Sequence, residues 1–202
     1  FCPAELKTLH QDEKQVSVEI IIDGKVQAMT AALLVAADGN NSQVLQMLNI
    51  GSSRKNYDQS ALITNITPGK KHNNVAYERF TDTGPMALLP LIDDGQGESR
   101  SALIWTMPSK KAKVLMDCDD ASFLTQLQER FGYRQGQFVR VGSRHAYPLK
   151  LTAASEQVRQ NIIVMGHAAH SLHPVAGQGF NLALRDAQVL ARLINENLSR
   201  HL

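Results

Sequence analysis

The stretch MGHAAHSLHPVAGQGFN, residues 165–181, carries the strongest fold signal in the chain. It follows an apolar run at residues 161–164 and leads into a pattern of helical period that extends from Gln178 to about Asn197. A buried strand, a glycine turn, a Pro/Gly-rich loop and a helix, in this order, direct backbone N–H groups and the positive end of a helix dipole at a ligand. The stretch therefore predicts an α/β unit with a ligand loop.

The glycines of this loop stand where the helix should begin. Gly177 and Gly179 flank Gln178, and a residue without Cβ lets the backbone approach a flat or anionic ligand closely. A tight turn at a crowded helix entry explains two glycines equally well. Their combination with Pro174 and Asn181 favours the ligand.

Three histidines, His167, His170 and His173, follow one another at intervals of three. On a helix they would share a face and could bind a metal. Pro174 and the strand-to-loop context disfavour a helix there, and no Asp, Glu or Cys nearby completes a ligand set. We therefore expect no metal and ordinary hydrogen-bonding roles for these side chains.

Composition limits the function classes. The chain has 202 residues, enough for one large domain or two small ones, and its formal net charge of +2 indicates no nucleic-acid partner. Cys2 and Cys118 form neither a disulfide framework nor a zinc pattern. The apolar runs are shorter than the roughly 20 residues that a membrane span requires.

The N-terminal part reads as α/β structure. Residues 16–22 and 26–30 predict a hairpin around the turn Asp23-Gly24. Residues 31–36 form a continuous small-apolar run, which predicts a strand buried on both faces. Asp38-Gly39 follows this strand as a plain turn or as part of a ligand site at the strand's carboxyl end. A short helix is predicted at residues 44–48.

The middle of the chain reads as an antiparallel sheet followed by a helix. Candidate strands at residues 61–67, 74–80, 86–92 and 101–106 are separated by Gly, Pro and Asp turn signals, and residues 121–130 predict a helix. A strand at residues 162–165 and the final helix then restore the α/β pattern. Leu182, Val189, Leu190, Leu193 and Ile194 define the predicted apolar side of that helix.

This order of elements predicts a fold of the α/β class, or α+β for this chain taken alone. A discontinuous α/β domain, at residues 1–55 and 158–202, would hold an inserted, mostly antiparallel β-sheet domain at residues 56–157.

Three segments resemble one enzyme family. Residues 166–186 resemble the second flavin-binding motif of the class A FAD-dependent aromatic monooxygenases, which usually reads Gly-Asp-Ala-Ala-His, then Pro, then Gly-Gln-Gly and Asn. Residues 31–42 resemble the Asp-Gly motif of that family. Residues 78–91 resemble the substrate-domain segment of its ubiquinone-biosynthesis hydroxylase branch. The chain is identified as a member of that branch.

The resemblance implies FAD as cofactor, NAD(P)H as cosubstrate, and hydroxylation of a polyprenylated phenol by O2. It implies a FAD-binding domain with an inserted substrate domain. It assigns no catalytic acid or base. The cofactor-binding residues that it implies are Asp38, Gly39, Gly166, His167, Pro174, Gly177, Gln178, Gly179, Phe180 and Asn181.

The chain departs from the family pattern in three places. His167 stands where the family usually has Asp, and Leu45 stands where it usually has Arg after the Asp-Gly pair. The Gly-x-Gly-x-x-Gly of the first Rossmann βαβ unit is missing from the sequence. The resemblance therefore implies an N-terminally truncated chain that is inactive and binds FAD weakly or not at all by itself.

Two other functions fit the same residues. A flavin monooxygenase of a small soluble aromatic would share the FAD site and differ only in the cavity of the sheet domain. A non-catalytic fragment would serve as a structural or partner-binding module. For the lead function, the resemblance implies other ubiquinone-biosynthesis proteins as partners. It also implies a cytoplasmic location with at most peripheral contact with the inner membrane.

Overall fold

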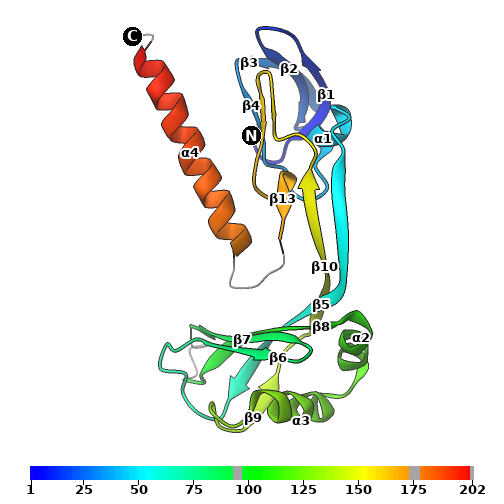
Figure 1. Ribbon diagram of the computed structural model, residues 1–202, viewed down its shortest axis with the longest axis vertical. Helices are drawn as coiled ribbons and strands as arrows, with labels where there is room; N and C mark the ends of the chain where they lie inside the picture. The colour runs from blue at the N-terminus through cyan, green and yellow to red at the C-terminus, as the bar shows by residue number, and fades with distance from the viewer. Residues whose placement is uncertain (93–96, 173–177, 201–202) are drawn as a thin grey trace. The chain divides into compact units, whose positions relative to one another are not determined.

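The computed structural model describes residues 1–92, 97–172 and 178–200. The chain divides into two compact units, one formed by Phe1–Lys55 with Lys150–Leu202 and the other by Asn56–Leu149 (Figure 1). The second boundary between the units lies between Leu149 and Lys150, whereas the sequence predicted a boundary after residue 157. The roles of FAD-binding and substrate domain remain predictions for these parts.

A three-stranded antiparallel sheet begins the first unit. It consists of β1 (Glu5–Gln11), β2 (Val16–Ile22) and β3 (Lys25–Ala31), in this order. Asp23 and Gly24 both have positive φ, 49° and 73°, as expected for a two-residue turn between right-twisted strands. The predicted hairpin is confirmed. The strand β1 was not predicted, because Leu6 and Leu9 are its only large apolar residues.

A second small sheet joins distant parts of the chain. Its members are β11 (Val158–Arg159), β12 (Ile162–Val164) and β4 (Leu34–Ala36), and β4 pairs with β12 in parallel. The expectation of a strand buried on both faces from residue 31 is wrong. Only Ala36 is buried, and Val35 is 39% exposed, because the core of this unit lies on the Ala36 side.

The core of the first unit lies around α1 (Gln43–Met47), which confirms the predicted short helix. The Ser42 hydroxyl accepts a hydrogen bond from Leu45 N at 3.1 Å and caps the helix. The helix packs against the parallel strand pair and the turn that follows it. The buried cluster comprises Ala36, Val44, Leu45, Ile50, Val164, Ala168 and Ala169.

After β12 come a 3₁₀ turn, η1 (Gly166–Ala168), a short strand, β13 (His170–Ser171), and the long helix α4 (Gln178–Arg200). The predicted helix is confirmed, but its predicted apolar side is only partly covered. Val189, Leu193 and Ile194 are 40%, 46% and 39% exposed, because α4 contacts the rest of its unit along a narrow seam.

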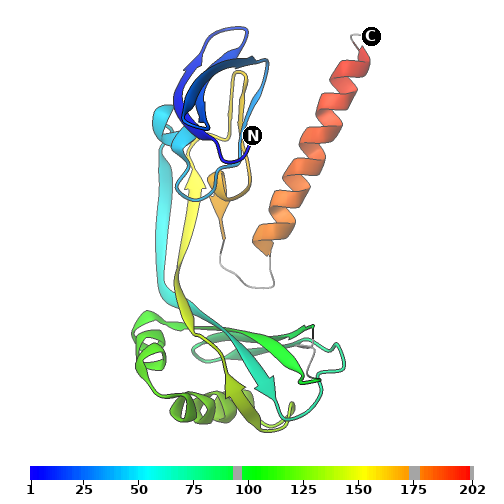
Figure 2. The same ribbon diagram turned by 180° about the vertical axis from the view of Figure 1, so that it is seen from behind.

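The second unit holds an antiparallel sheet, which confirms the prediction for the middle of the chain (Figures 1 and 2). In hydrogen-bonding order the whole seven-stranded sheet reads β13-β10-β5-β8-β7-β6, and β9 also pairs with β5. Strands β6, β7, β8 and β9 lie within the second unit, whereas β13 and parts of β5 and β10 belong to the first. The bounds are Ser52–Pro68 for β5, Tyr77–Thr81 for β6, Gly84–Leu91 for β7, Arg100–Pro108 for β8, Phe138–Val141 for β9 and His145–Ala154 for β10.

Two helices, α2 (Ser109–Asp117) and α3 (Asp120–Phe131), pack against one face of this sheet. Alternate residues of β8 enter this core, including Leu103, Trp105 and Met107, each 0% exposed. The structure confirms the helix predicted at residues 121–130 as α3, whereas α2 was not predicted. Ala112, Leu115 and Met116 have the helical spacing that could have revealed α2.

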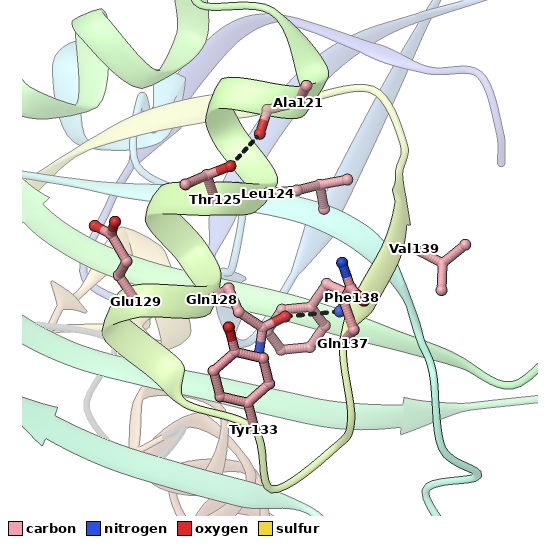
Figure 3. A pocket seen from close by; sticks show the side chains of 9 residues that line it. All are labelled: Ala121, Leu124, Thr125, Gln128, Glu129, Tyr133, Gln137, Phe138 and Val139. Carbon is pink, nitrogen blue, oxygen red and sulfur yellow. Dashed lines mark hydrogen bonds between the residues drawn. The ribbon is translucent and has the colours of Figure 1, made fainter.

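Gln128 of α3 forms hydrogen bonds with the backbone of the segment that leads to β9. Its side-chain oxygen accepts a hydrogen bond from Phe138 N at 2.8 Å (Figure 3). Its Nε2 donates to the carbonyls of Gly132 and Gly136. Gln128 and Phe138 help to line a hollow of about 600 Å³. Because all of these amide contacts go to backbone groups, we assign Gln128 a structural role.

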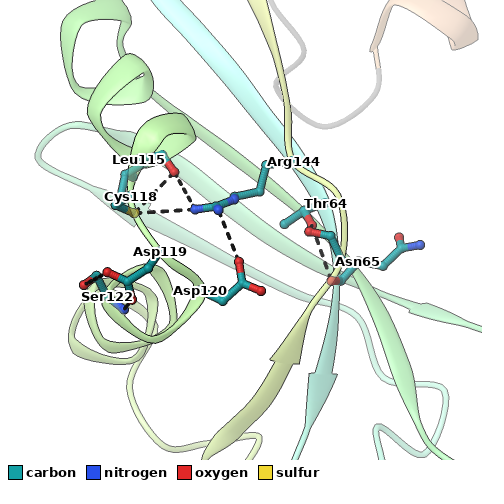
Figure 4. A network of polar contacts seen from close by, with 9 residues as sticks. Thr64, Asn65, Leu115, Cys118, Asp119, Asp120, Ser122 and Arg144 are labelled. Atoms are coloured by element: carbon teal, nitrogen blue, oxygen red, sulfur yellow. Dashed lines mark hydrogen bonds and ion pairs between the residues drawn. The ribbon is translucent and has the colours of Figure 1, made fainter.

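Arg144 connects α2 with the start of α3 through hydrogen bonds. Its Nη1 donates to Leu115 O at 2.9 Å and contacts Cys118 Sγ at 3.5 Å, while Nη2 donates to Asp120 Oδ1 at 3.1 Å (Figure 4). The guanidinium also lies 5.2 Å from the centre of the Phe123 ring. These contacts account for Arg144 without a role in binding.

Candidate functional site

The parallel pairing of β4 and β12 brings two predicted motifs to one edge of the sheet. Ala36 pairs with Val164, and Met165 N donates to Ala36 O at 2.9 Å. Asp38-Gly39 follows the carboxyl end of β4, and Gly166-His167 follows the carboxyl end of β12. Ligands of open α/β sheets bind outside the carboxyl ends of such strands.

Gly166 makes the turn from β12 into η1 possible. Its φ is +60°, in the left-handed region that glycine adopts without the strain of other residues. A Cβ at this position would also lie 3.8 Å from Ala183 Cβ of α4. The glycine thus reverses the chain at the point where α4 approaches it.

Gly179 lies in the first turn of α4, and the described atoms around it leave room for a side chain. A Cβ at Gly179 would lie 3.8 Å from His167 Nε2, an ordinary van der Waals distance. Glycine within a helix costs about 1 kcal/mol relative to alanine. A ligand that approaches this backbone closely would account for the glycine, so the first turn of α4 fits a bound cofactor.

The N-terminus of α4 can receive negative charge. The first N–H groups of a helix have no partner within the helix, and the helix dipole is positive there. Gln178, Phe180 and Asn181 are exposed, with Phe180 exposed by 74%. A hollow of about 340 Å³ beside this turn is lined by Leu172, Gln178, Asn181, Leu182 and Arg185.

Asp38 contacts the backbone at the start of α1. Its Oδ2 accepts hydrogen bonds from Gln43 N at 2.8 Å and Val44 N at 3.2 Å, which stabilises the start of α1. Gly39 has φ +87°, and a Cβ there would meet no atom within 4 Å. The contact of Asp38 and Gly39 with a cofactor stays a prediction.

The other predicted site residues differ in what can be said of them. Gly166, His167 and residues 178–181 gather where α4 meets η1. Pro174 and Gly177 lie outside the described residues. His170 Nε2 of β13 and Asp186 Oδ2 of α4 lie 3.7 Å apart.

Two further observations concern residues 1–92, 97–172 and 178–200. Within these ranges, no three His, Cys, Asp or Glu side chains are arranged to hold a metal ion. No described helix combines the length and the apolar character that are needed to cross a membrane.

Comparison with known protein families identifies the fold of this site. A family model described as an FAD binding domain matches residues 2–201. The chain belongs to this FAD-binding family. The predicted family is thereby confirmed. The matched region includes the N-terminus of α4 and the sheet edge that carries Asp38-Gly39 and Gly166-His167, which we call the glycine-rich edge.

Curated relatives place the chain near ubiquinone hydroxylases. Ubiquinone hydroxylase UbiL of Rhodospirillum rubrum is 38% identical over 191 residues, which cover 95% of this chain and 43% of the relative. The 3-demethoxyubiquinol 3-hydroxylase of Escherichia coli K12 is 32% identical over 188 residues, which cover 93% of this chain and 46% of the relative. The chain thus spans less than half the length of these relatives.

The fold also matches a solved structure. That of pqsL from Pseudomonas aeruginosa, described as a probable FAD-dependent monooxygenase, superimposes with a TM-score of 0.74 at 23% identity. The match covers 98% of this chain and 55% of that one. The predicted fold class, a partial FAD-binding domain with a large sheet, is confirmed.

Proposed function

We propose that the whole protein is an FAD-dependent monooxygenase that hydroxylates a polyprenylated phenol in ubiquinone biosynthesis, with NAD(P)H and O2 as cosubstrates. One observation carries this proposal. The match to relatives named as ubiquinone hydroxylases covers 95% and 93% of the chain, and therefore includes the sheet unit as well as the glycine-rich edge. Similarity confined to the cofactor-binding part would support only a flavoprotein.

FAD, when bound, supplies the transfer of electrons from NAD(P)H to O2 and of the oxygen atom to the phenol. The chain's contribution is to bind and orient it. We expect the N–H groups of Gly179 and Phe180 to face the electron-rich edge of the flavin ring, where the positive end of α4 stabilises negative charge. Pro174 would lie beside the ring, and Asp38 and His167 would contact its ribityl or pyrophosphate side.

The sheet unit offers an apolar surface on the face opposite its core. Ile63 pairs with Ile104, and Ile104 pairs with Ala87, so these three side chains form a row across β5, β8 and β7. Leu89 and Ala102 form part of the next row. Ile63 is 37% exposed and Leu89 is 39% exposed. This surface supports a substrate with a long apolar tail. Such a substrate partitions into membranes, and we therefore expect peripheral contact of the whole protein with the inner membrane.

The test is substrate turnover by the whole protein. We expect NAD(P)H consumption to match the hydroxylated product when polyprenylated phenols are supplied, and to exceed it with unprenylated ones. The I104S variant should lose the preference for prenylated phenols and keep its FAD. V114S, at a residue 62% exposed on α2, is the matched control. Uncoupled NAD(P)H oxidation with every phenol would contradict the substrate assignment.

A further inference from the structure

The helix α4 touches its own unit through one narrow seam. Its partly buried residues recur at intervals of three and four, as expected for a single helix face, and the other positions from Gln178 to Ser199 are exposed. The seam residues are Gly179, Leu182, Ala183, Asp186 and Leu190. Asp186 is the charged member of this otherwise small or apolar set. A charge at such a position is costly unless a partner compensates it.

His170 supplies that partner from β13. The distance from its Nε2 to Asp186 Oδ2 is 3.7 Å, and the two side chains are 12% and 33% exposed. His170 Nε2 is buried and has no hydrogen-bond partner within the described part of the chain. A neutral imidazole therefore leaves a buried polar atom unsatisfied, whereas a protonated one forms an ion pair with Asp186.

The position of the pair links it to the glycine-rich edge. His170 pairs with Ala153 of β10, so its backbone is held in a sheet, and it follows directly after the turn that contains Gly166 and His167. Asp186 lies on the same face of α4 as Gly179, about two helical turns further on. A contact between the two side chains thus sets where the first turn of α4 lies relative to η1.

We propose that His170 and Asp186 are positioning residues that hold the first turns of α4 against η1 and thereby set the affinity for the flavin. This inference rests on the proposed function for the identity of the cofactor. Asp186 on α4 is a charged group in contact with His170, and β10 pairs with the backbone of His170 through the uncharged Ala153.

The experiment compares D186N with the matched control E196Q in the whole protein. Glu196 lies on the same helix and contacts Arg192 at 3.8 Å on an exposed face. In the apoprotein, we expect hydrogen exchange of the α4 amides between Gly179 and Asp186 to increase about fivefold in D186N and not in E196Q. The FAD dissociation constant of D186N, measured by flavin fluorescence, should rise about fivefold, and that of E196Q should stay at the wild-type value.

A double-mutant cycle tests whether the two residues act together. H170Q should resemble D186N, and the double variant should bind FAD no more weakly than either single variant. Additive losses of FAD affinity in the double variant, or unchanged amide exchange in D186N, would contradict the proposal that His170 and Asp186 act as a pair. Faster exchange with unchanged FAD affinity would overturn its link to the cofactor. A wild-type protein that binds no FAD would contradict the proposed function, and the apoprotein exchange would still decide whether the pair holds the helix.

Discussion

Ala36 and Val164 lie side by side in parallel register, although they belong to opposite ends of the chain. A parallel pair needs a crossover connection between its strands, and here the connection contains the whole second unit, Asn56–Leu149. The pairing therefore makes that unit an insertion. It also brings Asp38-Gly39 and Gly166-His167 to one edge, so the proposed cofactor site depends on it.

Truncation of Val164 tests this dependence. Val164 is 4% exposed within the core of the first unit, and V164A should lower the free energy of unfolding by about 2 kcal/mol. Denaturant unfolding of the whole protein measures the loss. V35A, at the neighbouring 39% exposed position, is the control and should change stability by less than about 1 kcal/mol. Equal losses in the two variants would mean that this core does not hold the strand pair.

Gly179 should separate stability from cofactor binding. The described neighbours leave room for a Cβ, with His167 Nε2 at 3.8 Å, so G179A should keep stability or raise it by up to about 1 kcal/mol. Its added methyl group should obstruct the flavin and weaken FAD binding, measured by fluorescence titration. G51A, whose Cβ would lie 3.6 Å from Ser155 Oγ, serves as control. If G179A binds FAD with wild-type affinity, the flavin does not approach the backbone of Gly179 closely.

Asp38 is expected to stabilise α1 directly. Its carboxylate accepts two backbone N–H groups at the start of this helix, and D38A should lower the unfolding free energy by about 1 kcal/mol. D38N keeps an acceptor oxygen and should lose less. Thermal unfolding in the absence of FAD measures both variants, with D117A at the exposed end of α2 as control. If D38A unfolds like D117A, the contacts of Asp38 with α1 contribute no stability.

The pair of Glu156 and Arg159 predicts part of the acid sensitivity. The hydrogen bond from Arg159, with Nε to Oε1 at 2.9 Å, lowers the pKa of Glu156, and the Glu156 carboxylate raises the pKa of Arg159. Because the folded-state pKa of Glu156 is depressed, its stabilising contribution is complete above about pH 4.3 and is lost as the pH falls through the folded value.

Unfolding experiments between pH 3 and pH 7 measure this contribution. E156Q should be less stable than wild type near neutral pH, and the difference should shrink toward pH 3. Arg159 also donates to Leu48 O at 3.0 Å, so removal of Glu156 leaves that contact to the end of α1 in place. A difference between E156Q and wild type that stays constant with pH would show that the ionised carboxylate is not the stabilising group.

Features that depend on neighbouring residues could be predicted from the sequence. Asp23-Gly24 specifies a hairpin because both residues accept positive φ at low cost, and Ser42 begins α1 because its hydroxyl caps the following backbone. The apolar run at 102–105, rich in β-forming residues, specifies a strand. The glycine-rich loop and its family resemblance depend on the same local order of residues.

Only the tertiary structure decided which of these elements meet. Val35 and Val189 are apolar in sequence and exposed in the fold, because burial depends on what packs against them. Asp38 turns to α1, and His170 reaches Asp186 across the seam of α4. The pairing of Ala36 with Val164 brings the two halves of the proposed site together. These are contacts between residues distant in sequence, and they form when hydrophobic burial and strand pairing outweigh the entropy of closing long loops.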